Sequence, residues 1–284
     1  MTKILACIDG TPGTSDVCDY AVWAARRLLA PLTFLHVIDR QLGVAPMHDF
    51  SGSLGLGAQE SLLRELSALD EQRSRLAQEH GRQILEGACA RAAEAGLTDV
   101  EGRQQHGTLV DTLLEWQDEI RLIVLGQHPH DSTSGRRHLD HHVERVIRAV
   151  HRPVLVAAGA FRPIERFAIA FDASGTGRRM VETVARSPFL RGLPCEVVTS
   201  TGDPASISGD LRWAEQTLAE AGYDVRTAAV TGEPEDVLNQ HVRDRDMHLL
   251  VMGAYGHSRI RHLVVGSTTT SLLRTSQVPV LVLR

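Results

Sequence analysis

The stretches Leu122-Ile-Val-Leu-Gly126 and Leu249-Leu-Val-Met-Gly253 each combine four consecutive apolar residues with a closing glycine. A second matched pair, Arg152-Pro-Val-Leu-Val-Ala157 and Val278-Pro-Val-Leu-Val-Leu283, follows at a similar distance in both places. Short, continuously apolar runs of this kind are typical of strands buried on both faces of a parallel sheet. Their recurrence in the same order indicates that one domain occurs twice in the chain.

The earlier parts of the two copies match as well. Each copy opens with an apolar strand that ends in an aspartate, which is Asp9 in the first copy and Asp172 in the second. The first copy differs by a long insertion between its second and third strands. Residues 41–58 of this insertion are rich in Gly and Ser and predict a mobile loop. Residues from about 59 to 95 predict a long helix, because leucines recur there at helical spacing.

Apolar strands that alternate with amphipathic helices predict parallel sheets joined by right-handed crossovers. We therefore expect an α/β protein with two tandem, doubly wound, five-stranded parallel-sheet domains of Rossmann-like type. Their predicted ranges are residues 1–160 and 161–284, each with about four helices. The connection over residues 157–163 is short, so the two domains should pack closely.

The composition fits an ordinary globular protein, with 43% hydrophobic and 23% charged residues and a formal net charge of −5. This mild charge provides no electrostatic basis for binding nucleic acid or an anionic membrane. No apolar run approaches the ~20 residues that span a bilayer. The four cysteines are scattered without CxxC or framework spacing, which favours a reduced, cytoplasmic chain.

A phosphate-binding loop is predicted in the second copy, after the strand that ends at Gly253. Gly253 and Gly256 allow the backbone to approach a phosphate without a Cβ in the way. Gly266-Ser267-Thr268 stands at the expected N-terminus of the last helix, where free N–H groups and hydroxyls offer an anion site. His257 either adds positive charge over the phosphates or faces solvent. A set of ordinary turns is the competing interpretation.

This spacing, Gly-x-x-Gly, nine residues and then Gly-Ser, resembles the ATP-binding signature of the universal stress protein family, and the resemblance covers nearly the whole chain. It implies a fold like that of the adenine nucleotide alpha hydrolases. Single-domain members pair through their final strands, so a tandem member would be similar to such a dimer fused into one chain. The resemblance thus implies an intramolecular pseudo-dimer or a homodimer.

The resemblance also implies ATP, with Mg²⁺, as the ligand of the second copy. Asp172 would lie near the ribose and the metal ion, and the backbone near Ser200 would border the adenine, although an apolar residue is usual there. Asp172 as a plain strand end or a helix cap is the alternative. The predicted nucleotide-binding residues are Asp172, Ala173, Ser200, Met252, Gly253, Gly256, His257, Gly266, Ser267 and Thr268, with Asp172 also as metal ligand.

The first copy lacks the glycine loop. Gly126 is followed by Gln127-His128-Pro129-His130-Asp131, and Asp140-His141 stands where the second copy has Gly-Ser. Carboxylates repel phosphates and Cβ atoms crowd them, so we expect no nucleotide in this copy. The histidines between His128 and His142 are either a degenerate exposed loop or, as a lesser alternative, a metal site.

These features predict a nucleotide-dependent regulator in the stress response, which binds ATP in its C-terminal domain and acts on a protein partner. The loop offers no evident general base for water, so an enzyme is not the first expectation. Slow ATP hydrolysis or adenylyl transfer is one alternative. A metal or small-molecule sensor that uses the His-rich segment is another.

Two further expectations concern packing. The leucines of the long helix, which include Leu66, Leu69 and Leu76, should cover one face of the first sheet, although a partner-binding helix is the alternative. Trp23, Trp116 and Trp213 should pack helices onto the sheets.

Overall fold

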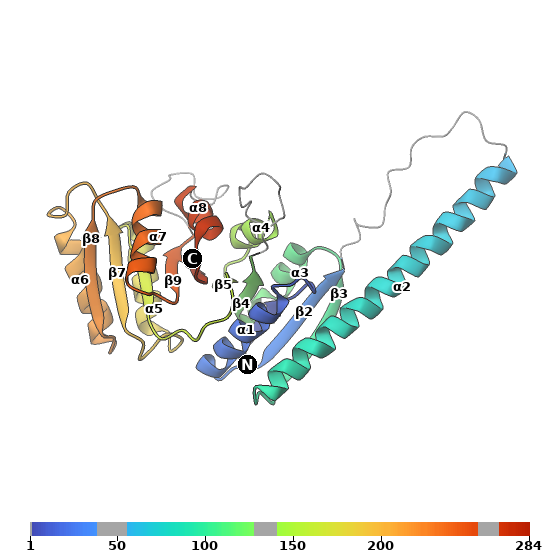
Figure 1. The fold of residues 1–284 in the computed structure, drawn as a ribbon, viewed down its shortest axis with the longest axis horizontal. Coiled ribbons are helices and arrows are strands. Elements are labelled where there is room, and N and C mark those ends of the chain that lie inside the picture. The colour runs from blue at the N-terminus through green and yellow to red at the C-terminus, as the bar shows by residue number, and fades with distance from the viewer. Residues whose placement is uncertain (1, 39–55, 128–140, 255–266) are drawn as a thin grey trace.

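The computed structural model describes residues 2–38, 56–127, 141–254 and 267–284 (Figure 1). The N-terminal half contains β1 (Lys3–Cys7), α1 (Thr14–Leu28), β2 (Leu32–Ile38), α2 (Leu56–Glu94), β3 (Val100–His106), α3 (Leu109–Trp116), the 3-10 helix η2 (Gln117–Glu119), β4 (Ile120–Gly126), α4 (His141–Ala149) and β5 (Val154–Ala157). The C-terminal half contains β6 (Phe167–Ala170), α5 (Gly175–Arg186), β7 (Cys195–Ser200), α6 (Ser208–Glu220), β8 (Val225–Val230), α7 (Pro234–Asp244), β9 (Leu250–Gly253), α8 (Ser267–Thr275) and β10 (Val280–Leu283).

All ten strands form one sheet, in the order β3-β2-β1-β4-β5-β10-β9-β6-β7-β8. Within each half every neighbouring pair is parallel, and the two halves have the same strand order. The predicted α/β fold with two doubly wound, five-stranded parallel sheets is therefore confirmed.

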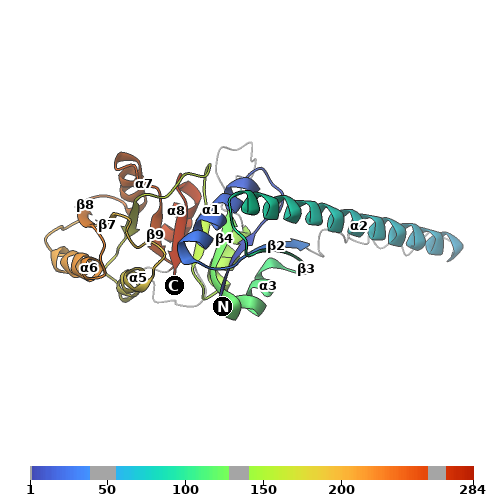
Figure 2. The ribbon, with the colours of Figure 1, turned by 90° about the horizontal axis from the view of Figure 1, so that it is seen from below.

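Helices cover both faces of this sheet (Figure 2). On one face α1, α5, α6 and the C-terminal part of α2 enclose a core with alternate strand residues such as Ile4 and Ala6. On the other face α3, α4, α7 and α8 enclose a second core, which contains Leu5. Residues of a strand alternate between faces, so burial of both faces explains why the central strands are apolar throughout.

The seam between the halves is the antiparallel pairing of β5 with β10. Val280 pairs with Val156, Leu281 with Leu155 and Val282 with Val154. All six side chains are buried, with at most 3% of their surface exposed. The expectation that the final strands of the two copies lie together within one chain is confirmed.

Each half also caps the last helix of the other. The Gln127 side chain of the N-terminal half donates hydrogen bonds to the carbonyl oxygens of Leu273 and Arg274, at 2.7 and 3.1 Å. Arg284 of the C-terminal half donates to the carbonyl oxygens of Arg148 and Val150, at 3.0 and 2.8 Å. Because the last carbonyls of a helix have no partner within it, these side chains stabilise α4 and α8 by their contact across the seam.

The linker after β5 is held firmly against both halves. The Phe161 ring meets the Tyr20 ring edge-on at a centroid distance of 4.9 Å, and its backbone N–H donates to Asp16 at 2.8 Å. The Arg162 guanidinium forms two hydrogen bonds with the carboxylate of Asp246, at 2.8 and 3.0 Å. These interactions agree with the prediction that a short connection brings the two domains into close contact.

The Asp246–Arg162 pair predicts a measurable change in pKa. Hydrogen bonds from Arg162, and then from His248, lower the pKa of Asp246 from 3.8 to about 2. The folded pKa lies below the unfolded value, so the pair stabilises the fold above about pH 4, and this contribution is lost as the pH falls towards 2. We expect Arg162→Ala to raise the pKa of Asp246 towards its ordinary value in an NMR pH titration of the side-chain carboxyl. A titration that is identical in the variant would contradict the pairing.

Helix α2 corrects the expectation for the long helix. Its bounds agree with the prediction, but Leu66, Leu69 and Leu76 are 41%, 50% and 63% exposed and do not cover the sheet. The helix extends well beyond the sheet, and only its C-terminal part lies against β2 and β3 (Figure 1). There Leu85 and Ala92 are buried, with 7% and 0% exposed. Helical periodicity predicts an apolar stripe along a helix, but it does not predict how much of that stripe another element will cover.

This division of α2 predicts unequal effects of two matched substitutions. We expect Leu85→Ala to lower the free energy of unfolding by about 2–4 kcal/mol, because it leaves a cavity against the sheet. Leu76→Ala, in the same helix but in solvent, should change it by less than ~0.5 kcal/mol. Urea unfolding followed by circular dichroism measures both. Equal losses would mean that the exposed part of α2 packs against another surface in solution.

The tryptophans and cysteines mostly follow the sequence prediction. Trp213 of α6 stacks on Phe171 beside the sheet, whereas Trp23 of α1 reaches across the seam to Phe189, at a ring distance of 4.9 Å. All four cysteines are free, and burial raises the pKa of Cys7, Cys18 and Cys195 to about 12. In the ranges that the structure describes, no helix has the length and apolar character needed to cross a membrane.

Candidate functional site

Three predicted site residues meet at one edge of the C-terminal half. Asp172 follows β6, Ser200 ends β7 and Gly253 ends β9, and these three strands are neighbours in the order β9-β6-β7. The chain leaves β6 towards β7 on one side and β9 lies on the other, so the order of the strands reverses at β6. In open parallel sheets this crevice, outside the carboxyl ends of the strands, is where ligands bind.

Asp172 is positioned by the turn that leads into α5. Its Oδ1 atom accepts hydrogen bonds from the backbone N–H and the hydroxyl of Ser174, at 3.0 and 2.7 Å. Ser174 in turn caps α5, since its Oγ accepts from the N–H of Gly177 at 3.0 Å. Ser174, not Asp172, is therefore the helix cap. Within the described residues Oδ2 of Asp172 takes part in no hydrogen bond or ion pair, which leaves it available to a ligand.

Gly177 makes room for this carboxylate. A Cβ atom at Gly177 would lie 2.4 Å from Oδ1 of Asp172, which is closer than real Cβ atoms come. Neither Gly177 nor Ser174 was among the residues predicted for this site. The signal for Ser174 was the Asp-x-Ser spacing before a helix, but the contact of Gly177 depends on the path of the turn and is visible only in the fold.

Ala173 has an unusual backbone conformation, with φ = +56°. The corresponding position of the N-terminal half, directly after Asp9, is Gly10 at φ = +80°. The left-handed turn is therefore common to both halves, but only the first half has the glycine that adopts it without strain. Strained residues of this kind are concentrated at ligand sites.

The end of β9 and the start of α8 lie together. The Thr269 hydroxyl donates to the carbonyl oxygen of Gly253 at 3.3 Å, which joins the first turn of the helix to the last residue of the strand. Thr269 is buried, whereas Thr268 beside it is exposed. The free N–H groups of α8 thus begin at the carboxyl edge of the sheet, where a helix N-terminus attracts anions.

The end of β7 carries two hydroxyls, one on the predicted residue Ser200 and one on Thr199, which was not predicted. The hydroxyl of Ser200 donates to the carbonyl oxygen of Gly232, so it ties β7 to the segment after β8. The Oγ1 atom of Thr199, one residue earlier, is buried and has no hydrogen-bond partner among the described residues. An unsatisfied buried hydroxyl is costly, and no described residue offsets this cost at Thr199. Met252 is buried in the second core, so only its backbone faces this edge.

Other predicted residues lie outside the described ranges. These are Gly256, His257 and Gly266 of the second copy, and most of the His-rich segment of the first copy, residues 128–140. The expected mobile loop at residues 41–58 lies outside them up to residue 55, and residues 56–58 begin α2. In the parts of the chain that are described, no cluster of three or more His, Cys, Asp or Glu side chains could hold a metal ion.

In the N-terminal half, α2 lies against the turn that follows β1. A Cβ atom on Gly10, in the turn after β1, would lie 2.5 Å from Cδ1 of Ile84. A Cβ atom on Gly81 would lie 2.5 Å from Cδ2 of His36, whose Nδ1 is 2.9 Å from the carbonyl oxygen of Ile8. The helix thus lies directly against the turn that corresponds to the Asp172 turn. In the C-terminal half α6 begins only at Ser208, with no counterpart to the long N-terminal part of α2.

The family assignment follows from comparison of the whole chain with known proteins. The model of the Universal stress protein family matches residues 1–158 and again residues 165–284. The chain belongs to this family. Universal stress protein Slr1230 of Synechocystis sp. is 33% identical to it over 288 residues, which cover 100% of both chains.

Solved structures agree with this fold. The structure of a universal stress protein from Archaeoglobus fulgidus has a TM-score of 0.72 at 18% identity and covers 99% of this chain and 98% of its own. A functionally unknown protein from Pseudomonas aeruginosa has a TM-score of 0.65 at 20% identity and covers 100% of this chain and 92% of its own. At these identities the likeness shows the tandem fold alone.

The strained turn at Ala173 predicts a stabilising substitution. We expect Ala173→Gly to raise the free energy of unfolding by about 0.5–1 kcal/mol, because glycine adopts positive φ without the Cβ clash. Ala173→Val should lower it, since a β-branched residue tolerates this region poorly. Thermal and urea unfolding measure both variants. If glycine destabilises the protein, the turn is not strained in solution.

Proposed function

We propose that this universal stress protein binds ATP with Mg²⁺ in its C-terminal half and acts as a nucleotide-dependent regulator. The observation that carries the proposal is the meeting of Asp172, Gly253 and the N-terminus of α8 at the reversal point of the sheet. A carboxylate beside a helix N-terminus and a glycine strand end suits a nucleotide whose phosphates are bridged to the protein by a metal ion.

Each group would have a distinct role. The free N–H groups of α8, with Thr268 and Ser267, would bind the phosphates, and Gly253 would let them approach the backbone. Asp172 fits Mg²⁺, because its Oδ2 oxygen is uncommitted and Gly177 leaves space around the carboxylate. Mg²⁺ prefers oxygen ligands and commonly joins one or two carboxylates to phosphates and water. The backbone near Ser200 would border the base.

The N-terminal half, residues 1–160, would be the partner that does not bind a nucleotide. Two observations support this division. The first copy replaces Gly-Ser with Asp140-His141, and α2 lies against the turn after Asp9.

Regulation would come from a change, on ATP binding, in the surface that the C-terminal half presents to a partner protein or to a second copy of the chain. The four unpaired cysteines are consistent with work in the reduced cytoplasm.

The two halves provide matched variants for a test. Asp172→Asn keeps the oxygen that accepts from Ser174 but removes the charge, so we expect it to weaken Mg²⁺-dependent ATP binding at least tenfold in calorimetry. Asp9→Asn makes the same change in the first half and should leave the affinity unchanged. Saturating ATP should raise the unfolding temperature of the wild type and not that of Asp172→Asn.

Three outcomes would count against the proposal. Wild-type protein that binds no adenine nucleotide removes it, and equal loss in both aspartate variants removes the division between halves. Steady release of ADP or AMP from ATP that stops in Gly253→Ala but not in Gly126→Ala would identify a slow enzyme instead of a regulator.

A further inference from the structure

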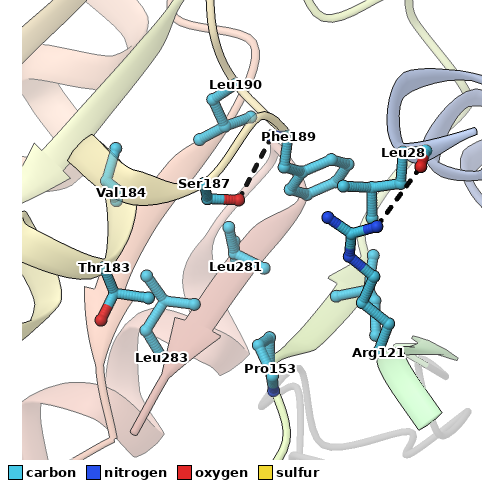
Figure 3. Close-up of a pocket in the computed structure, with 11 residues that line it drawn as sticks. Leu28, Arg121, Pro153, Thr183, Val184, Ser187, Phe189, Leu190, Leu281 and Leu283 are labelled. Carbon is cyan, nitrogen blue, oxygen red and sulfur yellow. Dashed lines mark hydrogen bonds between the residues drawn. The ribbon is translucent and has the colours of Figure 1, made fainter. Parts of the chain in front are cut away.

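A hollow lies on the seam, and its lining shares no residue with the candidate nucleotide site. It encloses about 550 Å³, including its open mouth, and is bounded by the ends of α1 and α5, the segment after α5, and strands β4 and β10 (Figure 3). Its floor is apolar and buried, and the lining includes Leu122, Val184, Phe189, Leu281 and Leu283.

Arg121 is the one charged residue in the lining of this hollow. Its guanidinium has a single, long hydrogen bond to the carbonyl oxygen of Leu28, at 3.4 Å (Figure 3). Within the described ranges no carboxylate lies within ion-pair distance of it. A guanidinium has five N–H donors, so most of its donors face the hollow or solvent unused. The neighbouring Arg27 is committed, since it donates to the carbonyl oxygens of Phe189 and Arg191.

The repeat gives this hollow a counterpart at the other end of the seam. Arg121 stands directly before the residues Leu122–Gly126 of β4, and His248 stands directly before the matching residues Leu249–Gly253. On the helices, Thr183 of α5 corresponds to Tyr20 of α1, as each follows its aspartate, Asp172 or Asp9, by the same interval. The two ends of the seam are therefore built from equivalent positions.

At the counterpart position, side chains of the linker after β5 fill the site. Phe161 packs its ring against Tyr20, and Ile164 is buried with 4% exposed. The polar residue there is satisfied too, since Nδ1 of His248 lies 2.9 Å from the carbonyl oxygen of Pro163 and 3.1 Å from the N–H of Glu165. One linker joins the halves, so it can fill only one of the two equivalent positions.

We propose that the open hollow binds a small amphipathic monocarboxylate, whose apolar body takes the place that Phe161 and Ile164 take in the counterpart. Its carboxylate pairs with the Arg121 guanidinium. In the counterpart, the equivalent residue His248 has the carbonyl oxygen of Pro163 beside it. A carboxylate suits this position because the guanidinium fork binds it through two hydrogen bonds, and the lining holds no acidic side chain to repel it. Leu283, in the floor, pairs with Gly253 in the sheet, so this site is adjacent to the proposed nucleotide edge but separate from it.

The test uses octanoate and its uncharged analogue 1-octanol with the full chain. We expect octanoate to bind the wild type, and Arg121→Gln to weaken it at least tenfold while changing 1-octanol binding less than twofold. Arg152→Gln, a nearby arginine outside the lining that pairs with Asp118, should change neither ligand. Thr183→Trp, at the exposed mouth of the hollow, should weaken both.

A measurement on the wild type keeps the proposal testable if a variant fails to fold. Nuclear Overhauser contacts should appear between the octanoate chain and the methyl groups of Leu281 and Leu283. No octanoate binding at millimolar concentration, or contacts only with other methyl groups, would overturn the proposal. Equal affinity for octanoate and 1-octanol in the wild type would overturn the role of Arg121 as the carboxylate partner.

Discussion

The antiparallel pairing of β5 with β10 determines the arrangement of this protein. A five-stranded sheet on its own would have β5 (Val154–Ala157) at its edge. This strand has two apolar faces, and the N–H and C=O groups on its outer side would be unpaired. Pairing the two final strands removes both of these inner edges and buries six aliphatic side chains. The outer edges are β3 and β8, which are the most exposed strands of the sheet.

The same pairing sets the relation between the two halves. Because β5 and β10 run in opposite directions, the carboxyl edges of the two parallel sheets face opposite ways, and the turns at Asp9 and Asp172 lie at opposite edges of the joint sheet. The cross-seam caps from Gln127 and Arg284 depend on this relation, since each reaches a helix end of the other half. A chain that repeats one domain is nevertheless asymmetric, because a single linker crosses the seam and packs against Tyr20 at one end only.

The halves have also diverged at their carboxyl edges. In the first, the insertion extends the helix after β2, and Ile84 lies against the turn at Gly10. In the second, that helix is short, and Asp172 is half-buried at the edge where α8 begins. The aspartate turn is retained in both, with a left-handed residue after it, and the halves differ in the length of the helix after their second strand and in the loop that follows their fourth.

The sequence by itself determined the repeat, the five apolar strands of each half and the position of Asp172 and Gly253 at strand ends. These are local properties, because apolar runs, periodicity and turn residues such as glycine and proline can be recognised within a few residues of sequence. Only the tertiary structure decided that Leu66, Leu69 and Leu76 face solvent, that Gly177 makes room for the Asp172 carboxylate and that Arg121 borders an open hollow. Each of these depends on contacts between segments distant in the sequence, and no local pattern specifies what a side chain will meet once the sheet has closed across its seam.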